Sequence, residues 1–115
     1  MKIIFNKILP FPGFMAMSFC GIIFVREKYR GYENTSVFQR MVNHEAIHFE
    51  QQKELLFIGF FVLYVLEWMF RLVFHTRTAY RGISFEREAY AHETDTDYLS
   101  RRKRFSWLSY FRKNE

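Results

Sequence analysis

A helical repeat of side chains over residues 37–54 is the longest regular pattern in the chain. Positions three or four apart lie on one stripe of a helix, and this stripe consists of Val37, Met41, His44, His48 and, one turn further, Gln51 and Gln52. Ser36 and Gln39 stand at its start with the spacing of a capping box. The pattern therefore predicts a helix of about five turns.

Two more helices are predicted downstream. Residues 55–75 form an almost uninterrupted apolar run, which predicts a second helix. Further on, Ser84 is a good N-cap residue, and the acidic side chains that follow it favour the first turn of a helix. This pattern predicts a third helix over residues 85–103.

Short apolar runs in the first part of the chain predict β structure. Residues 15–19 and 22–26 are rich in strand-forming residues and are separated by Cys20-Gly21, so they form two short strands or one bent strand. Residues 2–12 contain two prolines and are predicted to be an irregular arm.

Length and composition narrow the fold class. The 115 residues leave room for one domain with one modest core, and half of them are hydrophobic. The single cysteine, Cys20, excludes an internal disulfide framework. We therefore expect an α+β fold that is mostly α. It would form a single domain over residues 1–115, with a short N-terminal β element and three helices.

The stretch that indicates a chemistry is His44-Glu45-Ala46-Ile47-His48. Two histidines four residues apart project from one face of the predicted helix, where they can bind one zinc ion, Zn²⁺. Glu45 can then act as a general base on a zinc-activated water. The alternative is a half-buried helix whose two histidines form hydrogen bonds to backbone or water.

A zinc peptidase site also needs a third protein ligand and an open position for water. Glu86, Glu88 and His92 compete for this role in the third predicted helix. Glu86 and Glu88 are about 200° apart on a helix, so only one of them can face the metal. The alternative is a charged solvent face, formed by Glu88, Glu93, Asp95 and Asp97.

Two motifs separated by a hydrophobic helix resemble those of the gluzincin metallopeptidases. They read His44-Glu45-x-x-His48 and Glu86-x-Glu88-Ala89. The likeness covers about residues 36–97 and is closest to the membrane-associated branch, which includes heat-shock, prenyl-protein-processing and antibiotic-sensor peptidases. The run from His44 to Gln52 is also similar to small bacterial zincins that have Gln-Gln after the second histidine.

The resemblance implies specific roles. In this family the third zinc ligand is the glutamate of a Glu-x-x-Ala-Asp stretch, which corresponds to Glu86. Tyr90 stands where the family often has the aspartate that steadies a ligand histidine, and we expect Tyr90 to replace it as a hydrogen-bond donor. The chain would then be a zincin-like metallopeptidase acting on a peptide or protein substrate. Tyr90, Tyr80 and His75 are candidates for polarising the substrate carbonyl.

A strand beside the predicted metal helix is a candidate for substrate binding. Ile22–Val25 is expected to be an edge strand beside the metal helix that holds an extended substrate by backbone pairing, or else an ordinary core strand.

The alternative to a peptidase is a helical, membrane-associated module without enzymatic activity, either metal-binding or metal-free.

The apolar run over residues 55–74 has three interpretations. Its length matches a bilayer span, although Glu67 and Arg71 would be costly there unless they are paired. It can instead be the central core helix of a soluble fold, or a face for shallow insertion or dimerisation. We expect association with a membrane, on the cytoplasmic side of a bacterial inner membrane; the alternative is a soluble cytoplasmic protein.

Basic and aromatic side chains alternate in blocks over residues 101–113. This composition suits an anionic membrane surface, where Trp and Tyr lie at the level of the headgroups. The net charge of +5 also permits nucleic acid, but no signature of a nucleic-acid-binding fold accompanies it, so no nucleic acid partner is expected. The alternative is a tail whose aromatic residues complete the small core.

Overall fold

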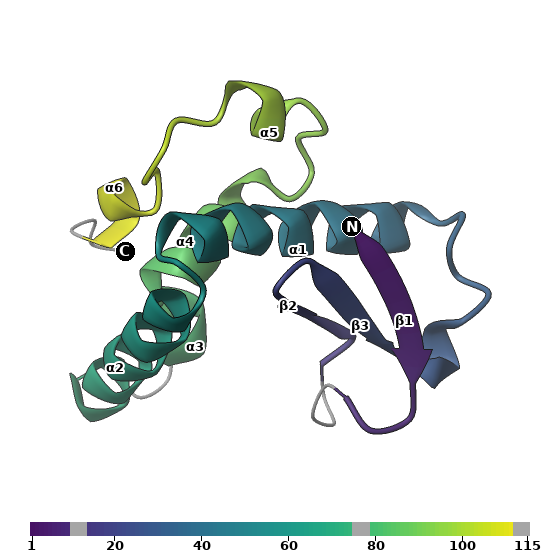
Figure 1. The fold of residues 1–115 in the computed structure, drawn as a ribbon, viewed down its shortest axis with the longest axis horizontal. Helices are drawn as coiled ribbons and strands as arrows, with labels where there is room; N and C mark the ends of the chain where they lie inside the picture. The colour runs from purple at the N-terminus through teal and green to yellow at the C-terminus, as the bar shows by residue number, and fades with distance from the viewer. Residues whose placement is uncertain (10–13, 75–78, 112–115) are drawn as a thin grey trace.

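The chain forms a small sheet followed by a series of helices (Figure 1). The computed structural model of the protein describes residues 1–9, 14–74 and 79–111. The strands are β1 (Lys2–Asn6), β2 (Ala16–Phe19) and β3 (Ile22–Arg26), and a 3-10 turn, η1 (Glu27–Tyr29), follows them. The helices are α1 (Ser36–Glu54), α2 (Ile58–Phe74), α3 (Ala79–Gly82), α4 (Ser84–His92), α5 (Tyr98–Arg101) and α6 (Leu108–Phe111). The expected class, α+β and mostly α, is confirmed.

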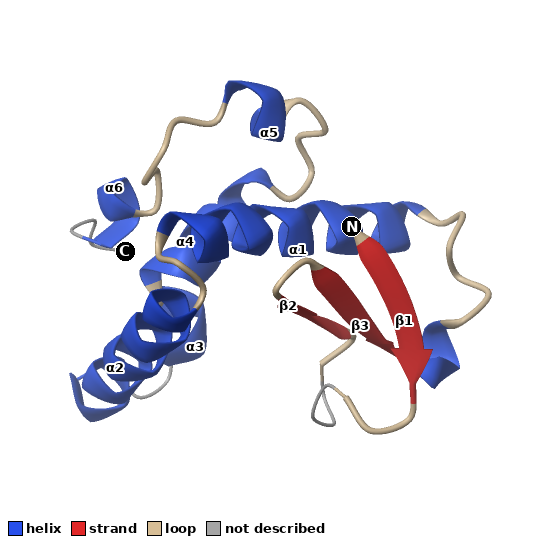
Figure 2. Ribbon diagram, viewed as in Figure 1, coloured by secondary structure: helices blue, strands red, loops and turns tan. Residues whose placement is uncertain are grey.

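The sheet has the strand order β1-β3-β2 (Figure 2). Strands β2 and β3 are antiparallel and joined by a two-residue turn, in which Cys20 and Gly21 have φ angles of 51° and 92°. Positive φ at both central residues is the condition for a type I′ turn, whose twist matches that of the strands it joins. The apolar runs are therefore two strands and not one bent strand.

The N-terminal arm contradicts the sequence prediction. Residues 2–12 are predicted to be irregular, yet residues 2–6 form β1, which is parallel to β3 and begins with Lys2 opposite Ile22. The partner strand satisfies backbone groups of β1, and Phe5 packs against the core. Residues 10–13 of the predicted arm lie outside the described residues. Because the pairing is distant along the chain, a local pattern does not reveal it.

Strand β3 lies in the centre of the sheet and not at its edge. Ile22–Val25 is predicted as an edge strand, but it is paired on both sides and Ile23 is fully buried. The alternative, an ordinary core strand, is right. The edge next to α1 is β2, because the Gln52 side chain donates to the Ser18 carbonyl and accepts from the Cys20 N–H, both at 3.0 Å.

A hydrophobic core lies between the sheet and the first half of α1. Its buried members are Ile23, Val25, Phe38 and Met41. The Phe38 ring also stacks on Phe5, with ring centroids 6.2 Å apart. This packing fixes the rotation of α1, and with it the direction in which the next turns of α1 project their side chains.

Helix α1 begins one residue earlier than the capping-box pattern implies. Thr35 is the N-cap, and its hydroxyl accepts a hydrogen bond from the Phe38 N–H at 3.2 Å. Ser36 is the first helical residue, and the Gln39 side chain donates to the Glu33 carbonyl and so does not close a capping box. The predicted helix is right, but its capping residue is wrong.

The C-terminus of α1 has the hydrogen bonds of a Schellman motif. The Phe57 N–H donates to the Gln52 carbonyl at 2.7 Å, and the Leu56 N–H donates to the Lys53 carbonyl at 3.2 Å. Leu56 and Phe57 have φ angles of 56° and 65°, in the left-handed region that glycine usually occupies. The chain turns sharply at this point, and α1 and α2 are bent by 109° relative to each other.

Helix α2 is not the central core helix. Within α2, all of which is described, Phe60 is the one buried residue, and most of the large apolar side chains are exposed. The core interpretation of the apolar run is therefore wrong. Among the described helices, none alone has the length and hydropathy needed to cross a membrane, while α1 and α2 meet that test only as a bent pair. The predicted end of this helix, residue 75, lies outside the described residues.

The predicted third helix over residues 85–103 is interrupted. Helix α4 ends at His92, and α5 begins only at Tyr98. The Asn43 side-chain amide lies 3.0, 2.8 and 3.0 Å from the backbone carbonyls of His92, Glu93 and Asp95. One side chain of α1 therefore satisfies carbonyls that a continuing helix would have used itself.

The C-terminal tail fits both of its interpretations in part. Trp107 is buried and packs on Phe85, with ring centroids 4.7 Å apart, so it completes a second core cluster. Leu108 and Phe111 remain exposed. Residues 112–113, the last basic pair of the pattern, lie outside the described residues.

Candidate metal centre

Three buried side chains from α1 and α4 meet at one point. His44 Nε2 and His48 Nε2 are 3.2 Å apart, and each lies 3.1 Å from Glu86 Oε1. The two histidines are one turn apart on α1, and Glu86 lies in the first turn of α4. The structure thus brings together the three residues that the sequence predicts as metal ligands.

The dimensions of this cluster suit a tetrahedral ion. With zinc–ligand bonds of about 2.0–2.1 Å, the atoms of a tetrahedral site lie about 3.3 Å from one another. The three separations in the cluster are within a few tenths of an ångström of that value. One shared proton can join only two of these three atoms by a hydrogen bond, whereas one metal cation can bind all three. The donor set of two imidazoles and one carboxylate is one that zinc prefers and leaves the fourth position open.

Charge in the cluster is arranged for a cation. Burial raises the pKa of Glu86, but the charge of His48 and hydrogen bonds from both histidines outweigh burial and hold the pKa well below its usual range. Burial lowers the pKa of His48, but the charge and hydrogen bond of Glu86 raise it to about 9. Without metal, the pair is therefore an imidazolium and a carboxylate, and an incoming cation displaces the proton.

The other nitrogen of His44 is held by an unexpected residue. Glu93 Oε1 lies 2.8 Å from His44 Nδ1, and Arg40 Nε lies 3.4 Å from Glu93 Oε2. Tyr90, the predicted substitute for the family's aspartate, instead places its ring edge-on to the His44 ring at 4.6 Å. The prediction that Glu93 lies on a solvent face is wrong, because its carboxylate is mostly buried and orients the buried His44 ring.

The other nitrogen of His48 is held by Gln51. His48 Nδ1 lies 2.8 Å from Gln51 Oε1, so it donates, and Nε2 is left to face the cluster. The Gln51 amide nitrogen donates in turn to the Phe85 carbonyl and to Glu88 Oε1, both at 3.0 Å. Gln51 belongs to the predicted helical stripe, but no role is predicted for it from the sequence.

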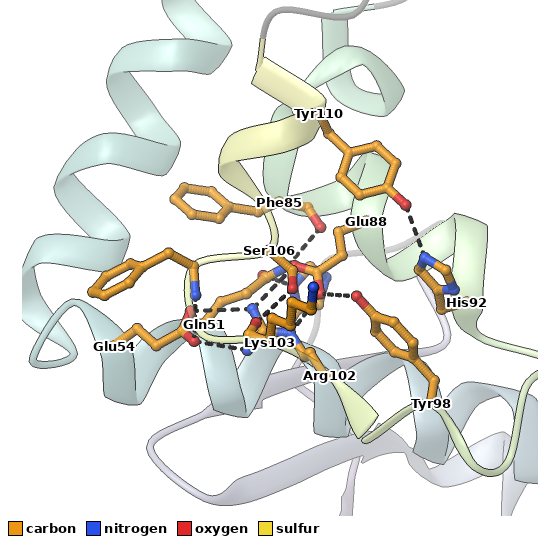
Figure 3. A network of polar contacts seen from close by, with 12 residues as sticks. Gln51, Glu54, Phe85, Glu88, His92, Tyr98, Arg102, Lys103, Ser106 and Tyr110 are labelled. Atoms are coloured by element: carbon orange, nitrogen blue, oxygen red, sulfur yellow. Dashed lines mark hydrogen bonds and ion pairs between the residues drawn. The ribbon is translucent and has the colours of Figure 1, made fainter. Parts of the chain in front are cut away.

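Glu88 is not a ligand and is not on a solvent face. It is fully buried, and Figure 3 shows it at the centre of a polar network beside α1. The Tyr98 hydroxyl donates to Glu88 at 2.6 Å, and the Arg102 guanidinium pairs with it while also binding Glu54 at 2.8 Å. Both expectations for Glu88, as a competing ligand and as an exposed charge, are therefore wrong.

His92, the other competing ligand, also lies away from the cluster. Its ring stacks on Tyr98 with centroids 3.7 Å apart, and its Nε2 lies 2.8 Å from the Tyr110 hydroxyl (Figure 3). Because both Glu88 and His92 belong to the network of Tyr98 and Arg102, they connect α4 to the C-terminal segment.

Helix α2 supports Glu86 from the opposite side. The Tyr64 hydroxyl donates to Glu86 Oε2 at 2.7 Å, so each oxygen of Glu86 has a separate partner. Glu67 Oε2 accepts from the Ser84 N–H at 2.8 Å, and Glu67 Oε1 accepts from the Ser84 hydroxyl at 2.7 Å. The Glu67 carboxylate of α2 thus caps the N-terminus of α4. The sequence predicts Ser84 as the N-cap residue of this helix, whereas Ser84 is its first helical residue.

Glu45 is buried next to the two histidines. Burial raises the pKa of Glu45 to about 7, against the lowering effect of both histidine charges and of a hydrogen bond from the Ser18 backbone. A carboxyl group with a pKa near neutrality can both accept and return a proton. This residue does not belong to the three-atom cluster, in agreement with the sequence prediction that it is not a ligand.

A cleft of about 200 Å³ opens onto this site. His44 and Glu45 form part of its wall, and the start of β2 forms another part. Tyr80 and Tyr90, two of the predicted carbonyl-polarising residues, also line the cleft. The third candidate, His75, lies outside the described residues.

Comparison of the chain with models of known protein families, with curated proteins and with solved structures gave no match.

Proposed function

We propose that this protein is a zinc-dependent metallopeptidase with a zincin-like centre. The observation that carries the proposal is the convergence of His44, His48 and Glu86 at 3.1–3.2 Å, with a buried fourth residue, Glu45, beside them in an open cleft. The ligand set supports zinc, and the cleft supports access for a substrate.

In this proposal the residues of the site have three separate roles. His44, His48 and Glu86 hold the ion, which when bound supplies Lewis-acid activation of a water and of the scissile carbonyl. Glu45, buried beside the two histidines and lining the cleft, accepts a proton from the attacking water and passes it to the leaving amine. The Tyr90 ring limits the movement of His44.

The cleft favours an extended peptide as substrate. Strand β2 lies at the edge of the sheet, and Met15 and Ala16 at its start line the cleft beside Glu45. Backbone groups of Ser18 on this edge are already bonded to Gln52 and Glu45. An extended peptide can therefore pair, through backbone hydrogen bonds, with the part of the edge that precedes Ser18, and it would bring one carbonyl to the metal. This assigns to β2 the role that the sequence assigned to Ile22–Val25.

The experiment combines a metal count with one substitution on α1. Wild-type protein is expected to bind one zinc per chain and to cleave unstructured peptides. Glu45→Gln should retain zinc and lose ~10²–10⁴ in rate, because a general acid–base residue contributes about that factor. Glu50→Gln is the matched control, since Glu50 lies on the same helix and pairs with Lys53 away from the cluster.

Each outcome separates the candidate functions. Zinc in both variants with hydrolysis lost only in Glu45→Gln supports the peptidase. Hydrolysis that survives in Glu45→Gln contradicts the mechanism. Stoichiometric zinc without any peptide hydrolysis by the wild type would identify the metal-binding form of the alternative module. Absence of zinc would contradict the peptidase and identify the metal-free form of that module.

A further inference from the structure

The polarity of α2 is inverted relative to a water-soluble surface helix. The side that faces the protein carries Phe60, Tyr64, Glu67 and Arg71, which include both charged residues of the helix. The side chains of Arg71 and Glu67 are only 14% and 8% exposed and pair with each other at 3.1 Å. Helices on a soluble surface place charged residues outward and apolar residues inward. In α2 the charges are inside.

The rest of the helix surface is apolar and exposed. More than a third of the surface is exposed for each of Ile58, Val62, Leu63, Val65, Leu66, Trp68, Met69, Phe70, Leu72, Val73 and Phe74. These positions surround the helix on every side except the inward stripe. Soluble monomers rarely expose a continuous apolar patch larger than a few hundred Å².

The distribution of apolar side chains around α2 distinguishes between two kinds of partner, a second copy of the chain and a lipid bilayer. A second copy of the chain packing against α2 would cover one ridge-and-groove stripe of a helix and leave the remaining apolar side chains in water. Hydrocarbon chains of a lipid bilayer cover all outward sides at once, and they require that charged side chains turn toward protein partners. The buried pair of Glu67 and Arg71 meets that requirement.

Basic residues precede, along the chain, a helix that lies against the same apolar surface. A groove of about 500 Å³ joins α2, through Leu63, Leu66 and Phe70, to Leu108 and Phe111 of α6. Leu108 and Phe111 are exposed, and so are Lys103 and Arg104, which precede α6. Positive charges at the border of an apolar surface complement anionic lipid headgroups.

We infer that α2 and α6 form a membrane-docking surface whose partner is a bilayer containing anionic lipid. The outward side chains of α2 contact hydrocarbon, and Lys103 and Arg104 contact headgroup phosphates. The inference does not depend on the proposed peptidase, because none of these outward side chains belongs to the metal centre.

Flotation of the full-length protein with lipid vesicles tests the inference. Vesicles of phosphatidylcholine, with and without phosphatidylglycerol, are compared at low and high salt. The wild type should float with the anionic vesicles. The double variant Val65→Glu, Met69→Glu should bind these vesicles with an affinity at least about tenfold lower, because each charge placed in hydrocarbon is costly. The control Ile8→Glu, Tyr32→Glu adds the same charge at exposed apolar positions outside α2 and should float like the wild type.

A spectroscopic measurement leaves α2 unchanged. In a Trp107→Phe background, Trp68 on the outward face is the remaining tryptophan, and lipids brominated on their acyl chains should quench its fluorescence. Wild-type protein that does not float, a Trp68 that is not quenched, or a glutamate variant that floats normally would each overturn the inference. A detergent-free dimer that the same glutamates dissociate would assign the surface to a second copy and overturn it too.

Discussion

Exchange of one carboxylate for an amide at Glu86 or at Glu88 should separate zinc binding from fold stability. The two residues are two positions apart on α4, and both are buried. Glu86→Gln removes the anionic ligand. Loss of a partner that merely orients a ligand costs about 10–100-fold in metal affinity, so loss of the ligand itself should exceed that range. Zinc should then give this variant no thermal stabilisation.

Glu88→Gln should have the opposite effect. It weakens the contacts from Arg102, but Arg102 remains paired with Glu54 at 2.8 and 3.1 Å, so no buried charge is left alone. Each Glu88 oxygen accepts from two donors, so the amide replaces one acceptor by an NH2 group that accepts none. The two hydrogen bonds lost in this way cost about 2–3 kcal/mol or more. In a domain of this size that lowers the melting temperature by roughly 6–18 °C. Zinc affinity should fall by no more than about tenfold, because Gln51 keeps its bond to His48.

Thermal unfolding in chelator and in excess zinc, together with metal counts, measures both effects. Zinc at about 1,000 times its dissociation constant should stabilise the wild type and Glu88→Gln by about 4 kcal/mol, and Glu86→Gln by almost nothing. If Glu88→Gln loses zinc while Glu86→Gln keeps it, the assignment of the third ligand is refuted.

Three further substitutions test parts of the structure. Thr35→Ala removes the N-cap of α1 and should cost about 1 kcal/mol, seen as a lower melting temperature with unchanged zinc stoichiometry; an unchanged melting temperature would mean the cap is not formed. Leu56→Gly places glycine at a residue that has a left-handed φ and is 82% exposed, so little packing is lost and backbone strain is relieved. It should stabilise the protein by about 0.5–1 kcal/mol in denaturant titration, and a loss of stability would argue against the left-handed turn after α1. Tyr64→Phe removes the donor to Glu86 and should weaken zinc binding about tenfold in chelator competition without altering the fold; equal affinity would show that the hydroxyl does not orient the ligand.

Local periodicity was enough to predict α1, α2 and the β structure of residues 15–26, of which two separate strands were one of two alternatives. A 3.6-residue repeat and a two-residue turn are properties of neighbouring positions, and the sequence displays them directly. It was not enough for β1, whose partner lies from residue 22 onward. The break after His92 had a visible signal, since residues 93–97 are Glu-Thr-Asp-Thr-Asp, a composition that competes with helical backbone bonding.

The same distinction applies to the site. His44, Glu45 and His48 follow from spacing on one helix, and the family resemblance singled out Glu86. The residues that orient them were missed, because Glu93 and Glu88 are charged and a pattern places charges outside. Their burial depends on partners far along the chain, such as Arg102 for Glu88 and His44 for Glu93. Glu93 shares a helical face with Glu86, which is the one local signal that pointed to it.

Because α1 and α4 carry all three atoms of the candidate metal cluster and most of the side chains that orient them, the centre can be regarded as a transferable unit for protein design. His44, His48 and Gln51 come from one helix, and Glu86 comes from the other, with Glu93 at its C-cap. A scaffold that reproduces the packing of these two helices would need no sheet to assemble the cluster. What such a scaffold would lose is the cleft, since β2 supplies part of its wall. If the proposed function holds, binding the ion and binding a substrate would thus depend on separate parts of this architecture, and a designer could optimise them one at a time.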